Sequence, residues 1–127
     1  MKIKIKPKKI NKKNFNKFGQ IIDTSKKKYF RINNGYAKRY DNLGKINTSI
    51  KKGKTIISIF SAKTRKFPMK VDMMEKHPLG SQAFIPMKET SFLVFVAPRG
   101  SKPNLKKIES FRISKQTGIN LNPGIWH

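Results

Sequence analysis

Short runs of strand-forming residues, separated by turn residues, are the main pattern along this chain. Clusters that contain glycine, such as Asn33-Asn34-Gly35 and Pro78-Leu79-Gly80, punctuate the runs. Many short runs with regular turns are typical of a β-sandwich, a jelly roll or a barrel. The predicted strands cover residues 20–23, 29–32, 54–62, 67–73, 82–86, 92–98, 109–113 and 118–122.

The first part of the chain adds an edge strand and the one predicted helix. Residues 2–6 alternate lysine with isoleucine, a pattern typical of an edge strand that lysines protect from aggregation. Asn11 can cap a helix over residues 11–18, with Phe15 and Phe18 on one face and Gly19 at its end. A helical turn is expected at residues 103–108. Because no repeat or linker interrupts the pattern, we expect a single, mainly all-β domain over residues 1–127.

The absence of cysteine limits the chemistry. Any metal site has to use nitrogen and oxygen ligands, and neither a disulfide nor a thiolate nucleophile exists. The first ten residues lack the continuous apolar stretch of a signal peptide, and no apolar run reaches the length of a membrane span. We therefore expect a soluble, cytoplasmic protein without a membrane partner.

The net charge of +24 raises the question of nucleic-acid binding. Eleven of the 30 basic residues precede residue 29, so the excess lies mainly outside the apolar, motif-rich centre of the chain. Lysine strongly outnumbers arginine, whereas contacts to base edges and base stacking favour arginine. A solvated lysine surface is thus favoured over a nucleic-acid interface, and its field would raise encounter rates with small carboxylate substrates.

Two histidines, His77 and His127, are the residues best suited to proton transfer or metal ligation. Alternation on a strand puts Glu75 and His77 on the same face, and Gln82 follows shortly after. Two imidazoles with a carboxylate and an amide oxygen would suit Zn²⁺, Ni²⁺, Fe²⁺ or Mn²⁺. In the alternative reading, His77 is a hydrogen-bonded turn residue and His127 an ordinary terminal residue. The residues alone leave both open.

The spacing around both histidines resembles the ligand motifs of cupin barrels, with substitutions. Glu75-x-His77 with Gln82 takes the place of the first cupin motif, and Pro123-Gly124-x-x-His127 that of the second. Nearly the whole chain, moreover, is similar to the ureidoglycolate lyase family. The blocks that carry this similarity are residues 15–19, 29–35, 39–40, 57–59, 75–87, 92–97 and 124–127.

The resemblance implies an RmlC-like cupin jelly-roll barrel and a homodimeric enzyme of allantoin catabolism. Such an enzyme splits (S)-ureidoglycolate into glyoxylate and urea, with nickel as the cofactor; Mn²⁺ or Zn²⁺ are the alternatives. Family members continue past the Trp-His pair, so the resemblance implies a cupin domain without its usual C-terminal continuation. Members also often carry Tyr-His where this chain has Leu121-Asn122.

Roles for individual side chains follow as hypotheses. His77 and His127 would hold the metal with Glu75 and Gln82, and a Glu75 that is not a ligand would be the catalytic base, which requires burial. Further residues are expected to bind the substrate or add charge: Arg39 as a carboxylate clamp, Tyr40 as a wall, Lys88 as a second cation, and Ser81 and Asn120 as hydrogen-bond donors.

Two alternatives to these hypotheses stay open. Instead of binding a substrate carboxylate, Arg39 can form a surface ion pair with Asp41. The whole chain can be a non-catalytic cupin that binds small acids, and a basic nucleic-acid-binding protein is the third choice.

Overall fold

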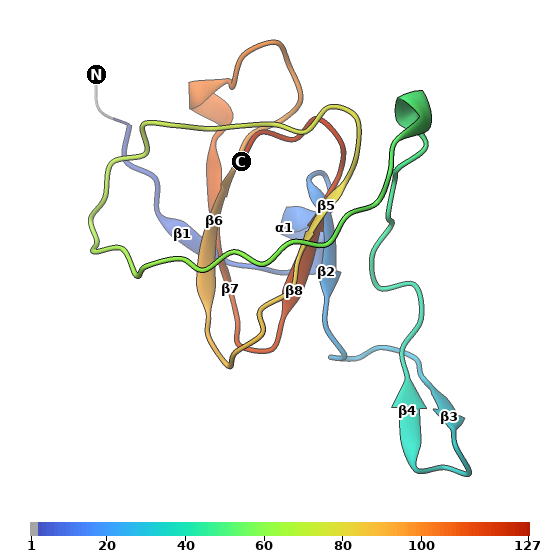
Figure 1. The fold of residues 1–127 in the computed structure, drawn as a ribbon. Helices are drawn as coiled ribbons and strands as arrows, with labels where there is room; N and C mark the ends of the chain where they lie inside the picture. The colour runs from blue at the N-terminus through green and yellow to red at the C-terminus, as the bar shows by residue number, and fades with distance from the viewer. Residues whose placement is uncertain (1–2) are drawn as a thin grey trace.

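Two three-stranded sheets make up the body of the molecule in this computed structural model, which describes residues 3–127 (Figure 1). One sheet has the order β1 (Pro7–Lys9), β7 (Glu109–Ile113) and β6 (Phe92–Val96), with β1 parallel and β6 antiparallel to β7. The other is antiparallel and has the order β2 (Gly19–Ile22), β8 (Gly118–Leu121) and β5 (Gln82–Phe84). The mainly β prediction is confirmed, but the strands do not close into a barrel.

The core lies where the two sheets meet the short helix α1 (Lys12–Phe15). Phe15 and Phe18 pack on Phe111 of β7 at ring-centroid distances of 5.3 and 5.9 Å, and all three side chains are fully buried. The predicted cap is confirmed, since Asn11 and Asn14 form a reciprocal capping box. Gly19 starts β2 at a place where a Cβ atom would overlap the carbonyl oxygen of Asn120.

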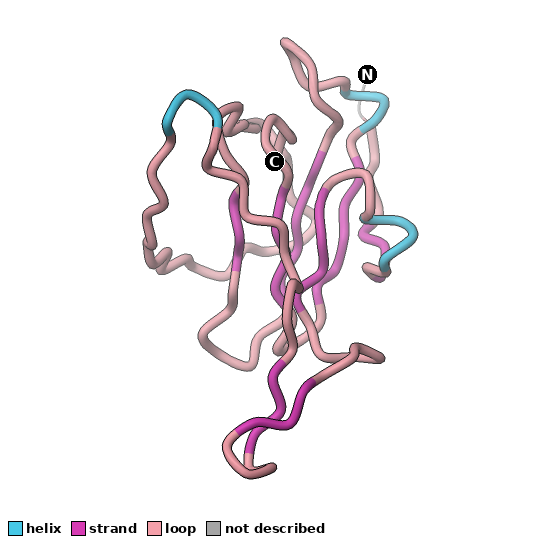
Figure 2. Tube along the Cα trace, turned by 90° about the vertical axis from the view of Figure 1, so that its right-hand side faces the viewer, coloured by secondary structure: helices cyan, strands magenta, loops and turns pink. Residues whose placement is uncertain are grey.

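A two-stranded hairpin, β3 (Phe30–Ile32) and β4 (Ala37–Arg39), projects away from both sheets in both backbone views (Figures 1 and 2). Its turn confirms the predicted Asn33-Asn34-Gly35 cluster, whose φ angles of 53°, 56° and 85° need residues that tolerate the left-handed region. Strand β4 was not predicted, because Ala37-Lys38-Arg39 carries almost no strand-type apolar signal.

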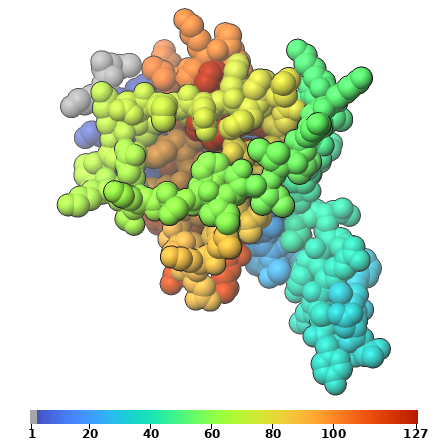
Figure 3. All heavy atoms as spheres, in the orientation of Figure 1, coloured from blue at the N-terminus to red at the C-terminus, as the bar shows by residue number. Residues whose placement is uncertain are grey.

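Two predicted strands, 54–62 and 67–73, are wrong, since neither forms a sheet ladder within the described residues. The segment instead crosses in front of the sheets, after the 3₁₀ turn η1 (Ile50–Lys52), as the green band of Figures 1 and 3 shows. Most of its apolar side chains face solvent, with Ile57 94% and Phe60 73% exposed. Strand propensity alone cannot form a strand without a neighbour to pair with, and this is why the expected barrel wall is missing.

The remaining expectations are largely met. Strands β2, β3, β5, β6, β7 and β8 lie within two residues of their predicted bounds, and η2 (Leu105–Lys107) forms the helical turn. The predicted edge strand at 2–6 is displaced: residue 2 lies outside the described residues, residues 3–6 form no strand, and pairing with β7 begins at Pro7. Within the described part of the chain, no helix is long and apolar enough to cross a bilayer.

Candidate active site

Glu75 and His127 form a cross-strand pair that brings the two halves of the predicted site together. The backbone amide of Glu75 donates to the His127 carbonyl oxygen at 2.7 Å, and the amide of His127 donates to the Glu75 carbonyl oxygen at 2.8 Å. The neighbouring residues Lys76 and Trp126 continue the antiparallel bridge, and Trp126 also pairs with Ala97. The backbone of His127 is therefore fixed to Glu75, and its neighbour Trp126 is fixed to a second segment at Ala97.

Side chains opposite each other in such a pair lie on one face. The Glu75 Oε1 atom lies 3.6 Å from Nε2 of His127, and the imidazole rings of His77 and His127 stack at 5.2 Å between centroids. The predicted shared face of Glu75 and His77 is thus observed. Glu75 itself is 69% exposed, so the burial that a catalytic base role requires is not provided within this chain.

The His127 ring has a defined hydrogen-bonding arrangement. Its side chain is 10% exposed, and Nδ1 lies 3.2 Å from the Ile125 carbonyl oxygen, an acceptor that places the ring proton on Nδ1. Nε2 then carries the free lone pair. Burial lowers the pKa of His127 below its usual 6.5; a charge on His77 acts in the same direction, while the Ile125 contact and Glu75 oppose it. His127 is therefore a neutral acceptor near neutral pH.

Gln82 joins this face from β5. It shares a face of the strand with Phe84, whose ring lies 6.0 Å from the His127 ring. Gln82 Oε1 and His127 Nε2 are both buried and lack a hydrogen-bond partner within the described chain. Buried acceptors without partners are costly unless a ligand satisfies them.

These two orphaned acceptors test whether the residues fit a metal ion. Imidazole nitrogen, amide oxygen and carboxylate are suitable donors for a divalent cation, and a backbone acceptor on Nδ1 is the usual support for a ligand histidine. Among residues 3–127, however, no three His, Asp or Glu side chains are grouped closely enough to hold one. The donors fit in kind, and His77 would have to turn out of its stack to join them.

An apolar cavity of about 260 Å³ opens beside His127. The lining side chains come from β5, β6 and the segment before Glu75: Val71, Met74, Phe84, Phe92 and Val94 are among them. His127 is the titratable group that faces this cavity. Sequence reasoning missed the lining, although period-2 alternation from Gln82 predicts that Phe84 shares its face.

Two of the predicted hydrogen-bond donors act as structural ties. The Ser81 hydroxyl accepts from the Asn47 amide at 2.8 Å, and the Ser81 amide donates to the Asn47 carbonyl oxygen at 3.0 Å. Asn120 is fully buried and donates to Gln20 Oε1 and to the Lys45 carbonyl oxygen at 2.8 and 2.9 Å. It alternates with core residue Leu121 on β8, so it lies on the face opposite Gln82.

The structure does not bring the remaining candidates to the histidines. Arg39 lies on the projecting hairpin and donates to Asp41 at 2.7 Å, which is the alternative that the sequence left open. Tyr40 follows it and packs on Tyr29 at 5.6 Å. Lys88 is exposed and belongs to the turn between β5 and β6, which Figure 1 shows at the end of the sheets away from the C-terminus.

A mainly β fold that places two imidazoles and a carboxylate beside an apolar cavity is typical of enzymes that use acid–base or metal chemistry. Comparison with known proteins makes this specific. The family model described as ureidoglycolate lyase matches residues 2–127. The chain belongs to the ureidoglycolate lyase family.

Named relatives agree with the family model. A ureidoglycolate lyase of Pseudomonas aeruginosa (strain LESB58) is 42% identical over 98% of this chain and 73% of its own length. The protein of that name from Stutzerimonas stutzeri (strain A1501) is 42% identical over 93% of this chain and 69% of its own. The one from Azotobacter vinelandii (strain DJ) is 39% identical over 93% and 71%.

Proposed function

We propose that this protein is a lyase that splits (S)-ureidoglycolate into glyoxylate and urea. The observation that carries the proposal is the match to relatives named ureidoglycolate lyase, 42% identical over 98% of the chain. We further propose that the enzyme acts in allantoin catabolism, in the cytoplasm, and has an RmlC-like cupin scaffold. The mainly β architecture and the Glu75-x-His77 spacing support that scaffold.

The reaction needs one proton to move and no water. The C2 hydroxyl of the substrate loses its proton, the C–O bond becomes a carbonyl, and the C–N bond breaks. The departing nitrogen takes up a proton and leaves as urea, so the atoms of the substrate are all found in the two products. The protein has to accept a proton at one position and return it at another.

Glu75 is the proposed base, because its carboxylate lies beside the two imidazoles and is free to turn. His127, kept neutral by burial, serves as an acceptor through Nε2 and not as the acid. The stacked His77 is exposed and would orient the hydroxyl of the substrate. The apolar cavity beside His127 would exclude water, which strengthens each of these polar contacts.

A divalent cation is the proposed cofactor, Ni²⁺ by family resemblance and Mn²⁺ or Zn²⁺ otherwise. Nε2 of His127 and Oε1 of Gln82, the two orphaned acceptors, would hold it together with a reoriented His77, and Glu75 would either complete the ligand set or stay free as the base. When bound, the cation would polarise the hydroxyl of the substrate as a Lewis acid.

A homodimer is part of the proposal. The β3–β4 hairpin stands apart from the body, and isolated two-stranded hairpins are marginal in water. Phe30 and Tyr36 on it are 62% and 93% exposed, so a second copy of the chain is the proposed cover. In that arrangement, the substrate carboxylate bound by one copy would be reached by Arg39 and Tyr40 of the other. Lys88 would add positive charge. The site would be positioned by the hydrogen bonds of Ser81 and Asn120.

The assay is glyoxylate release from racemic ureidoglycolate with Ni²⁺ or Mn²⁺ present. The wild type and a Lys106→Ala control, altered at an exposed residue of η2, should both exceed spontaneous decay, and His77→Ala should not. A wild-type rate equal to spontaneous decay would contradict the lyase and favour a cupin that only binds small acids. Full activity in folded His77→Ala would reject the site alone.

A further inference from the structure

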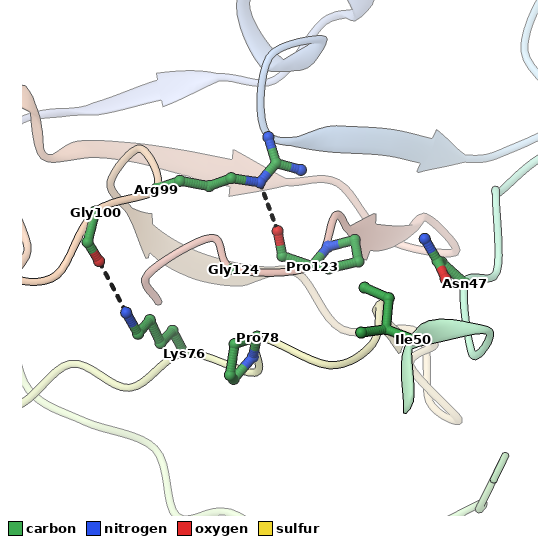
Figure 4. A pocket seen from close by; sticks show the side chains of 8 residues that line it. All are labelled: Asn47, Ile50, Lys76, Pro78, Arg99, Gly100, Pro123 and Gly124. Atoms are coloured by element: carbon green, nitrogen blue, oxygen red, sulfur yellow. Dashed lines mark hydrogen bonds between the residues drawn. The ribbon is translucent and has the colours of Figure 1, made fainter. Parts of the chain in front are cut away.

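A second hollow, distinct from the His127 cavity, lies on the other side of the Glu75–His77 segment. It has a volume of about 480 Å³ and is lined from four parts of the chain, with Asn47, Lys76, Arg99 and Gly124 among the lining residues. Because Lys76 alternates with Glu75 and His77 on an extended segment, its side chain points away from the histidines. Figure 4 shows the hollow from close by.

The Lys76 ammonium is held in place at one end of the hollow. Nζ donates to the Gly100 carbonyl oxygen at 2.8 Å and lies 4.8 Å from the centroid of the Trp126 ring. Trp126 Nε1 donates to the same carbonyl oxygen at 3.1 Å. One bond occupies one of three ammonium protons, so the others stay available to a ligand.

Arg99 is fixed in a similar way. Its Nε donates to the Pro123 carbonyl oxygen at 2.7 Å, and its side chain lies against Gly124. Within the described residues, neither terminal nitrogen of the guanidinium makes a hydrogen bond or an ion pair. These two nitrogens form the planar fork that binds carboxylate or phosphate with two parallel bonds.

Asn47, the other polar side chain in the lining, also offers a hydrogen-bond donor. Oδ1 of Asn47 accepts from the amide and hydroxyl of Ser49, which leaves the side-chain Nδ2 of Asn47 available. Figure 4 shows Asn47 and Ile50 at the end of the hollow away from Lys76. The lining residues, all in the described chain, include no carboxylate side chain.

We propose that this hollow binds a small oxyanion, a carboxylate or a phosphate, on the terminal nitrogens of Arg99, which point away from Lys76 in Figure 4, while the Lys76 ammonium adds positive charge from the other end of the hollow. Two cations held by backbone carbonyls supply positive charge, and one side-chain amide adds a hydrogen-bond donor. No carboxylate in the lining competes with a ligand for these groups. Preorganised donors lose little entropy when they bind, so the hollow differs from the solvated lysines elsewhere on the surface. The site is independent of the proposed lyase reaction.

The single tryptophan of the chain provides the test. Trp126 fluorescence is titrated with inorganic phosphate and, separately, with malonate, while sodium chloride keeps the ionic strength constant. The wild type should give a saturable change with at least one probe, and the tighter probe identifies the preferred source of the oxyanion. Arg99→Gln should weaken binding roughly tenfold or more, because a charge-assisted bidentate contact is lost.

Lys106→Gln is the matched control, since it removes one positive charge at an exposed residue outside the hollow, and it should bind as the wild type does. Equal affinities of wild type and Arg99→Gln would overturn the proposal. The proposal would also be overturned if the Trp126 fluorescence of the wild type did not change, or changed without saturating, with either probe. This outcome can be observed without any variant. The titration contains neither metal nor ureidoglycolate, so its failure would leave the lyase untouched.

Discussion

The imidazole rings of His77 and His127 stack at 5.2 Å between centroids with 20° between their planes. The lone pairs of stacked rings lie in two nearly parallel planes, so the two rings do not direct their nitrogens at one point between them. Burial and a charge on His77 both lower the pKa of His127. His127 is therefore best suited to the neutral state, which is the state that a metal ion or a substrate hydroxyl requires.

The stability of the protein should depend on pH through His127. Its pKa is lowered by burial, so below about pH 6.5 the unfolded chain binds a proton that the native chain does not. Stability should be complete above that value and fall as pH drops through the native pKa. Denaturant unfolding at about pH 8 and about pH 5 measures the difference, and His127→Gln should flatten it.

The lower pH of this unfolding measurement is set at about 5 so that the titration of Glu109 does not contribute. Burial acts to raise the pKa of Glu109, but hydrogen bonds and charge from Lys17 and Lys8 hold that pKa below its usual 4.5. Its contribution is lost only at lower pH. An equally steep pH dependence in His127→Gln and wild type would show that another group titrates.

Metal binding should appear as thermal stabilisation. At a Ni²⁺ concentration about 100 times the dissociation constant, the free energy of unfolding should rise by about 2.7 kcal/mol, and chelation should reverse it. The net charge of +24 disfavours loose cation binding, so a shift would report a specific site. Gln82→Ala should reduce the shift, and an equal shift in that variant would exclude Gln82 as a ligand.

Arg39 should act across the proposed dimer. Arg39→Ala and His77→Ala should each lose glyoxylate release, and a refolded mixture of the two should regain part of it, since some dimers then contain one intact site. Asp41→Ala, which removes the ion-pair partner of Arg39, is the control and should stay active. Full activity of Arg39→Ala alone would reject the role of this residue.

The aromatic core should dominate stability. Phe111→Ala removes a fully buried ring that packs on Phe15 and Phe18, at an expected cost of about 3–5 kcal/mol in the free energy of unfolding. Phe60→Ala makes the same change at a ring that is 73% exposed, where the expected cost is below about 0.5 kcal/mol. Similar losses at both positions, measured by denaturant unfolding, would mean that the 54–62 segment packs more tightly in solution.

Local features of the fold were predictable because they depend on neighbours in the chain. The Asn11 cap and the Asn33-Asn34-Gly35 turn follow from side-chain hydrogen bonding and from tolerance of positive φ. Period-2 alternation placed Glu75 and His77 on one face. The prediction from strand-forming residues was wrong at 54–62, where the strand signal is strong and the structure offers no partner strand within the described residues.

By itself, the sequence determined the β character, the family and the identity of the two histidines. The tertiary structure decided which groups meet: Glu75 with His127, Gln82 with the face of Phe84, and Lys76 with Arg99 around a separate hollow. It also set Arg39 apart on a hairpin. The physical reason is that these contacts join residues distant in sequence, and their register depends on burial and strand pairing across the whole molecule.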